Sequence, residues 1–128
     1  MEKHEKTTVA LDTNMLLNIK RFNADVFAQA KSLLGPCEFV VPEQVSFELE
    51  KMAARGMKLR KEVLVARELM AKNNVKVAKS DFSSADEALK KLAPKAIVAT
   101  NDKALKDSVR ELGGKVLQLR QRKYLEII

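Results

Sequence analysis

Two segments of the chain are apolar runs that end in oxygen-bearing side chains. They are Thr8-Val9-Ala10-Leu11-Asp12-Thr13-Asn14 and Ala96-Ile97-Val98-Ala99-Thr100-Asn101-Asp102. Carboxylate and other oxygen ligands select hard cations, which here means Mg²⁺ or Mn²⁺. Asp is also a preferred helix N-cap, so Asp12 alone is equally consistent with a purely structural role. The repetition of the arrangement around Asp102 favours a shared chemical role for the two acids.

Two further carboxylates stand at comparable positions in the chain. Glu48 interrupts the apolar stripe of a helix that begins near Pro42, and a carboxylate turned toward a core is costly unless it is paired or metal-bound. An ion pair between Glu48 and a nearby lysine is the structural alternative. Asp86 and Glu87 fall in the first turn of another helix, where acids complement the helix dipole, so a structural role stays open for each.

These acids must be positioned by secondary structure that the sequence pattern indicates. Apolar runs predict strands at residues 7–11, 38–41, 75–77, 96–99 and 116–119, and residues 125–128 are expected to fold back on the body. Helices are predicted after Asp12, over residues 23–34, from Pro42 to Gly56, over residues 58–73 and 85–92, and from Asp102 to Gly113, with Asn23 as one cap. Alternating strands and helices favour a parallel α/β sheet, in which ligands bind at the carboxyl ends of the strands.

Convergence of Asp12, Glu48, Asp86 and Asp102 at that edge would have an electrostatic consequence. Two carboxylates about 5 Å apart repel by roughly 3 kcal/mol at an effective dielectric near 20. Protons or cations must therefore neutralise the site. Neighbouring hydroxyls and amides could hold the ligands in orientation. These are Thr13, Asn14, Thr100 and Asn101.

The overall charge of the chain indicates what kind of substrate such an acidic site would act on. The formal net charge is +7, from 24 Lys and Arg against 17 Asp and Glu, which favours a nucleic acid as partner and an anionic membrane surface second. An acidic metal site in a basic protein suits hydrolysis of a phosphodiester. The single histidine (His4) and single cysteine (Cys37) exclude a paired-histidine mechanism and a cysteine-based zinc cluster.

Length and composition bound the organisation of the chain. Its 128 residues predict one domain over residues 1–128, with residues 1–6 as a flexible tail. No apolar run approaches the roughly 18 residues of a membrane span, and the polar start does not resemble a signal peptide. We therefore expect no membrane partner and a cytoplasmic location. No G-x-G-x-x-G occurs, and residues 77–79 offer no acceptor Asp, which argues against dinucleotide-binding and phosphorylatable receiver domains.

With these residues in order, the chain resembles the PIN-domain nuclease family along essentially its whole length. The matching segments are Leu11–Asn14, Val41–Val45 with Glu48–Lys51, Ser84–Leu89, and Val98–Lys103. The resemblance implies a PIN-like (5′-nuclease-like) three-layer α/β/α fold with a central parallel sheet of order 3-2-1-4-5. It further implies a Mg²⁺- or Mn²⁺-dependent endoribonuclease for single-stranded RNA that leaves 5′-phosphate and 3′-hydroxyl ends. The family's catalytic, metal-binding acids fall on Asp12, Glu48, Asp86 and Asp102.

The resemblance also points to branches within the family. Residues 119–126 are most similar to the branch that processes small-subunit ribosomal RNA, in which a second Asp often stands at the position of Glu87, here placed among the supporting residues. The toxin branch of toxin–antitoxin pairs comes next, and a catalytically silent RNA-binding or assembly module is the non-enzymatic alternative. Implied partners are single-stranded or structured RNA, a second copy of the chain, and a ribosome-assembly or antitoxin protein. Candidate RNA contacts are Lys103, Arg120, Arg122 and Lys123.

Overall fold

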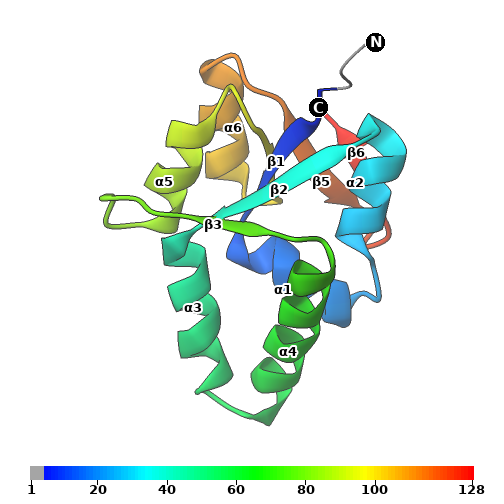
Figure 1. The fold of residues 1–128 in the computed structure, drawn as a ribbon, viewed down its shortest axis with the longest axis vertical. Helices are drawn as coiled ribbons and strands as arrows, with labels where there is room; N and C mark the ends of the chain where they lie inside the picture. The colour runs from blue at the N-terminus through cyan, green and yellow to red at the C-terminus, as the bar shows by residue number, and fades with distance from the viewer. Residues whose placement is uncertain (1–4) are drawn as a thin grey trace.

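A computed structural model describes residues 5–128, which form a six-stranded sheet between two layers of helices (Figure 1). The strands are β1 (Thr7–Leu11), β2 (Cys37–Pro42), β3 (Lys76–Ala78), β4 (Ile97–Ala99), β5 (Val116–Arg120) and β6 (Tyr124–Ile127). Their order is β3-β2-β1-β4-β5-β6, which confirms the expected order 3-2-1-4-5 and adds one strand at the edge. Of the expected flexible tail over residues 1–6, residues 1–4 lie outside the described part of the chain.

Six helices connect the strands within the described residues. They are α1 (Thr13–Arg21), α2 (Val26–Leu34), α3 (Glu43–Ala53), α4 (Met57–Lys72), α5 (Ala85–Leu92) and α6 (Lys103–Glu111). Two expected boundaries are wrong. Asp25, not Asn23, caps α2, because Asn23 adopts a left-handed turn conformation (φ 51°) before the helix. Pro42 ends β2 and precedes α3 as its N-cap, so it lies just outside the first helical turn. None of the helices formed by residues 5–128 has the length and apolar character required to cross a bilayer.

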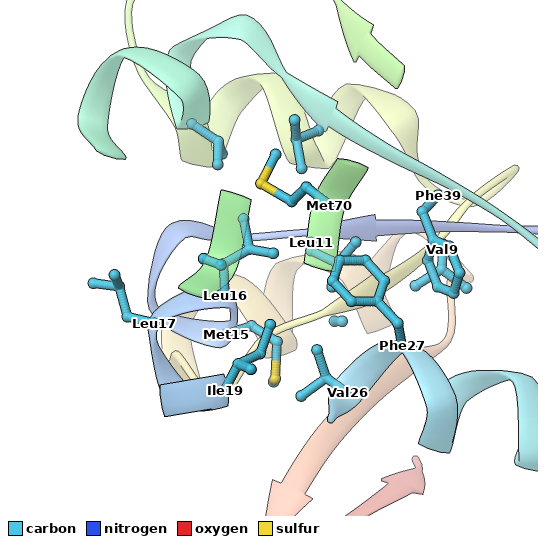
Figure 2. Packing of buried hydrophobic residues seen from close by; sticks show 14 of the residues in the cluster. Val9, Leu11, Met15, Leu16, Leu17, Ile19, Val26, Phe27, Phe39 and Met70 are labelled. Carbon is cyan, nitrogen blue, oxygen red and sulfur yellow. The ribbon is translucent and has the colours of Figure 1, made fainter. Parts of the chain in front are cut away.

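The two faces of the sheet bury different cores, because side chains alternate along each strand. Val9 and Leu11 join the larger core under helices α1 to α4, which Figure 2 shows around Phe27 and Phe39. Those two rings meet edge to face, with centroids 4.8 Å apart. Ala10 points to the opposite face, where a smaller core lies under α5 and α6. The last three residues of β1, Val9 to Leu11, are therefore all apolar and buried, as expected for a central strand covered by helices on both faces.

The sixth strand was not predicted from the sequence, which indicated only a fold-back of residues 125–128. Strand β6 pairs antiparallel with β5, in the register Arg120↔Tyr124 through Leu117↔Ile127. The turn between them places Gln121 and Arg122 at φ 53° and 58°, and Lys123 donates its N–H to the carbonyl of Arg120 at 3.0 Å. This tight hairpin geometry normally carries Asn-Gly, so Gln-Arg gave no turn signal.

A second difference lies in α4, whose buried stripe includes a carboxylate. Glu62 is almost fully buried and receives Nε–H of Arg21 on α1, at 3.0 Å from each carboxylate oxygen. The Arg21 side chain is one-third exposed, so its charge reaches water while that of Glu62 does not. The pattern of residues 58–73 predicted the helix, but it could not predict a buried acid whose partner lies 41 residues away.

Replacement of Arg21 tests this ion pair. We expect Arg21→Met to lower the free energy of unfolding by about 3 kcal/mol, because it leaves a buried carboxylate unpaired. Urea denaturation at pH 7.5 measures the change. Lys20→Met, at the exposed preceding position, is the matched control and should cost less than about 1 kcal/mol. The double variant Arg21→Met/Glu62→Met should recover most of the loss; equal losses in the single and double variants would contradict the role of the pair.

Candidate active site

The candidate site lies where the direction of strand succession reverses. In chain order the sheet grows from β1 to β2 on one side, whereas β4 lies against the other side of β1. Ligands of open α/β sheets bind at the carboxyl ends of the strands at such a switch point. The N–H of Asp12, just after β1, donates to the carbonyl of Ala99 at the end of β4, at 3.2 Å. The two acid-bearing segments predicted from the sequence therefore meet here.

Asp12 is the most constrained of the four acids. It is 8% exposed and serves as N-cap of α1, where its Oδ1 accepts the N–H of Met15 at 2.7 Å. Its Oδ2 accepts the hydroxyl proton of Thr100. Asp12 is therefore a helix cap and also the carboxylate at the switch point. A capping role and a role in metal binding are thus compatible in this side chain.

The surroundings of Asp12 disfavour its ionised form. Burial is the largest cause, and together with the negative charges of Asp86 and Asp102 it raises the pKa of Asp12 from 3.8 to about 6. The hydrogen bonds from Thr100 and from the Met15 N–H lower the pKa of Asp12 and so offset part of this effect. Asp86 and Asp102 therefore act on Asp12 through their charge, as expected if the three acids face one site.

Asp102 reaches the site through Thr100. The buried Thr100 hydroxyl donates to Asp12 and accepts the N–H of Asp102 at 3.0 Å, which fixes the backbone of the second acid relative to the first. Asp102 is exposed and caps α6, with Oδ1 accepting the N–H of Leu105 at 2.8 Å. Its Oδ2 makes no hydrogen bond with another described residue, so one oxygen of Asp102 stays open to a ligand.

Glu48 is connected to Asp12 through the residue that follows Asp12. The Thr13 hydroxyl donates to Glu48 Oε2 at 2.7 Å, linking the start of α1 to the middle of α3. Glu48 is half-buried and has no ion pair with any residue of the described range 5–128. The ion pair that the sequence left open as the alternative is therefore not formed within this range.

Asp86 and its neighbour Glu87 have different interactions. Both are exposed in the first turn of α5, which Ser84 caps by accepting the N–H of Glu87 at 3.2 Å. Asp86 contributes to the raised pKa of Asp12, whereas the Glu87 carboxylate pairs with Lys90 at 3.2 Å. Of the two acids, only Asp86 is coupled to Asp12.

The remaining two predicted supporting residues make no hydrogen bond to the acids within residues 5–128. The Asn101 side chain exchanges hydrogen bonds with the backbone of Leu119, at 2.9 and 2.7 Å, and so joins the end of β4 to β5. Asn14 is exposed, and its side chain has no hydrogen-bond partner among residues 5–128. Thr13 and Thr100 are the supporting residues that contact acids directly.

The donor set fits a hard divalent cation, because it consists of carboxylate oxygens with hydroxyls beside them. Among residues 5–128, no three acidic, His or Cys side chains already stand close enough to hold an ion. Mutual repulsion of like charges opposes such an arrangement without a cation. The observation that supports the fit is the raised pKa of buried Asp12, since a cation would remove the penalty on its charge.

Three of the four candidate RNA contacts lie on the β5–β6 hairpin. Because β4 and β5 are parallel, their carboxyl ends lie at the same side of the sheet. The turn after β5 therefore lies on the same side as Asp102, which follows β4. Arg120 pairs with Glu126 at 3.6 Å, and the guanidinium of Arg122 lies over the ring of Phe22 at 5.3 Å. Lys123 is exposed, while Lys103 on α6 pairs with Asp107 at 3.1 Å.

The sequence interpretation did not include the side chains that surround Glu48 on α3. Gln44, Phe47 and Lys51 stand one turn before, next to and one turn after Glu48, and all four line one cavity of about 170 Å³. The helical spacing i, i+3, i+4 and i+7 places them on one face and could have identified them. The apolar residues Val45, Leu49 and Met52 of the same helix gave the stronger pattern.

Comparison with known proteins gives consistent matches over most of the chain. A family model described as "PIN like domain" matches residues 9–122. Ribonuclease VapC4 of Methanocaldococcus jannaschii is 33% identical over 122 residues, which cover 91% of this chain and 92% of that protein. The fold is similar to that of the PIN domain endonuclease Utp24, with a TM-score of 0.74 and 23% identity, covering 93% of this chain and 90% of that one.

A further similar structure is a domain of a functionally unknown protein from Methanocaldococcus jannaschii. It has a TM-score of 0.61 and 21% identity, and the match covers 89% of this chain and 91% of that one. At this level of identity, the two structural matches establish the arrangement of the sheet and helices.

The raised pKa of Asp12 predicts a pH-dependent change in stability. The folded chain holds the proton of Asp12 up to about pH 6, whereas the unfolded chain loses it near pH 3.8, so this contribution to stability falls as pH rises through that window. Asp12→Asn removes the dependence. We therefore compare the free energies of unfolding of the variant and the wild type. The difference, variant minus wild type, should increase by at most about 3 kcal/mol between pH 4 and pH 7.5.

Urea denaturation in EDTA at the two pH values measures this difference. Asp25→Asn is the matched control, because Asp25 caps α2 through the same type of bond, to Ala28 N–H at 3.0 Å, from an exposed position. Its effect should not increase with pH in this way. A pH-independent difference for Asp12→Asn would show that burial does not penalise the Asp12 charge.

Proposed function

Because this chain belongs to the PIN-like domain family, we propose that it is a Mg²⁺- or Mn²⁺-dependent endoribonuclease acting on single-stranded RNA. The observation that carries the proposal is the buried carboxylate of Asp12 at the switch point, whose pKa is raised partly by the charges of Asp86 and Asp102. The relative named ribonuclease VapC4 supports an RNA substrate for this chain. The match over residues 9–122 supports treatment of residues 1–128 as one PIN domain.

In this proposal the four acids Asp12, Glu48, Asp86 and Asp102 hold the cation. A bound divalent cation would polarise the scissile phosphate and lower the pKa of a water molecule for attack on phosphorus. The chain's own groups prepare that arrangement. Thr100 orients Asp12, and Thr13 orients Glu48, so both ligands are held before the substrate arrives. Above about pH 6 Asp12 is ionised and able to bind a cation.

The basic residues of the hairpin supply the contacts to the flanking RNA backbone. Arg120, Arg122 and Lys123 follow β5 at the acid-bearing edge, and the net charge of +7 favours a polyanion. The likeness of residues 119–126 to the ribosomal-RNA-processing branch supports precursor ribosomal RNA as substrate. A toxin-type ribonuclease paired with an antitoxin protein, and a catalytically silent RNA-binding module, are the competing functions.

Cleavage of RNA separates the enzyme from the silent module. We expect wild-type protein to cut single-stranded RNA in Mn²⁺, leaving 5′-phosphate and 3′-hydroxyl ends, and EDTA to stop the reaction. Asp12→Asn should lower the rate at least about 100-fold, because metal-ion charge stabilisation contributes several kcal/mol to such reactions. Gel analysis of a labelled oligonucleotide measures the rate.

Glu48→Gln and Glu50→Gln form a matched pair for the same assay. Both change a carboxylate on α3 to an amide, but Glu50 is exposed and lies outside the cavity that Glu48 lines. Glu48→Gln should lower the rate, and Glu50→Gln should retain it. Equal cleavage by wild type and Asp12→Asn would indicate a contaminating nuclease and remove the enzyme proposal.

Metal binding should also stabilise the folded chain, since it relieves the repulsion among the acids. We expect 5 mM Mn²⁺ to raise the melting temperature by about 3 °C or more relative to EDTA, as ligand at tenfold its Kd gives about 1.4 kcal/mol. Asp12→Asn should abolish most of the increase, and Glu50→Gln should retain it. Differential scanning calorimetry provides the measurement. An identical increase in Asp12→Asn would mean that the ion binds elsewhere.

A further inference from the structure

A cavity of about 170 Å³ lies beside the proposed metal site, between α3 and the start of α5. Residues of both helices and of the preceding turn line it: Gln44, Phe47, Glu48, Lys51, Ser83, Ser84 and Ala85. Two of the proposed metal ligands define its position, because Glu48 lines the cavity and Asp86 directly follows Ala85. Any ligand in the cavity would therefore lie next to the bond that the metal site cleaves.

Phe47 is the only large apolar side chain of this lining, and it is 54% exposed. Hydroxyls, an amide and charged groups make up most of the rest. A larger cavity of about 340 Å³, lined in part by residues 79–82, is more apolar, with Pro42, Phe82, Ala88 and Leu92 in its lining. An apolar peptide side chain would be better matched by that cavity. The cavity at Phe47 instead combines one aromatic face with polar groups, which is the chemistry that binds a nucleobase.

Gln44 provides an independent sign of a missing partner. Its Nε2 donates to the carbonyl of Phe82 at 2.6 Å and to that of Ser80 at 3.3 Å. These two carbonyls fix the orientation of the amide, because a flipped amide would place its oxygen against theirs. Gln44 Oε1 is buried and has no hydrogen-bond partner among residues 5–128. A buried acceptor without a partner is costly, and a donor from a ligand would satisfy it.

The charge on the same helix face supports a nucleotide. Lys51 stands one turn after Phe47 and Glu48 and lines the same cavity. Its ammonium can neutralise a phosphate beside the cavity. A base against Phe47 would thus have a cationic group and the proposed cation site nearby, so phosphates of the bound strand would meet positive charge.

We propose that this cavity is a nucleobase subsite for the RNA strand, in which one base stacks on Phe47 and donates an N–H to Gln44. The subsite rests on the proposed function, because it binds the nucleotide adjacent to the cleaved phosphate. It restricts the substrate to an unpaired base, since a base held in a duplex cannot present both its face and its edge to these side chains. Phe47 is therefore a substrate-contacting residue, and Gln44 reads the edge of the base.

Binding of RNA by a variant that does not cleave tests the subsite separately from catalysis. In an Asp12→Asn background, fluorescence anisotropy with a labelled adenosine oligomer in Mg²⁺ gives the Kd. Phe47→Ala should raise the Kd about 5- to 150-fold, which corresponds to the loss of one stacked base. Phe47→Trp should restore binding, since it retains an aromatic face. Unchanged affinity of Phe47→Ala would overturn the subsite.

Leu33→Ala is the matched control for removal of an exposed apolar side chain. Leu33 is 47% exposed near the end of α2, at the opposite edge of the sheet, and should leave the Kd unchanged. A thermal melt of each variant checks folding. If Phe47→Ala abolished binding of an added protein partner but not of RNA, the surface would be a protein interface and the proposal would fall.

A base analogue tests the role of Gln44 without altering the protein. Purine riboside lacks only the 6-amino group of adenosine, so it retains stacking but loses one N–H donor. We expect an oligomer of purine riboside to bind about 2- to 10-fold more weakly than the adenosine oligomer, as for one lost hydrogen bond. Equal affinities would overturn the assignment of Gln44 Oε1 as the acceptor. If the wild-type protein did not cleave RNA but the binding results were as expected, the proposed function alone would be contradicted.

Discussion

The burial of one carboxylate at the end of a central strand is the constraint on which the rest of the site depends. Asp12 follows a strand that is covered on both faces, so its charge lies among apolar side chains and near two other acids. The fold limits the penalty with two hydrogen bonds, from Thr100 and from the N–H of Met15. A bound cation would offset the rest of the penalty for ionising Asp12, and this would favour metal binding.

The same atoms that prepare the site also stabilise the fold. Asp12 and Asp102 cap α1 and α6, and Thr100 connects them across the switch point between β1 and β4. Because each cap uses one carboxylate oxygen, the position of the other oxygen is set by the start of a helix. Exposure nevertheless differs: Asp12 is buried, whereas Asp102 is open to solvent. Only the buried acid carries a clear energetic penalty, so it is the main link between metal binding and stability.

Local patterns predicted most of the fold because most of its elements are specified by nearby residues. Apolar runs identified five strands, and the family resemblance implied their order in the sheet. The repeated arrangement after β1 and β4 identified Asp12 and Asp102. The misses involve partners distant in sequence or an unusual turn. Glu62 is buried against Arg21, which lies 41 residues away. The turn before β6 carries Gln121-Arg122 in place of a typical hairpin sequence. The cavity around Gln44 joins α3 to residues 83–85, so the spacing within α3 shows only part of its lining.

The alternation of side chains along β1 fixes the register between β1 and β4, and with it the relative positions of the residues that follow these strands. Val9 and Leu11 belong to the larger core under α1 to α4, while Ala10 belongs to the smaller core under α5 and α6. A slip of one residue would exchange these faces, so the register Leu11↔Ala99 is strongly specified. That register places Asp12 beside Thr100, because each directly follows its strand. The geometry of the site is thus a consequence of core packing, and a mutation at Ala10 that enlarged the side chain would disturb the acids without contacting them.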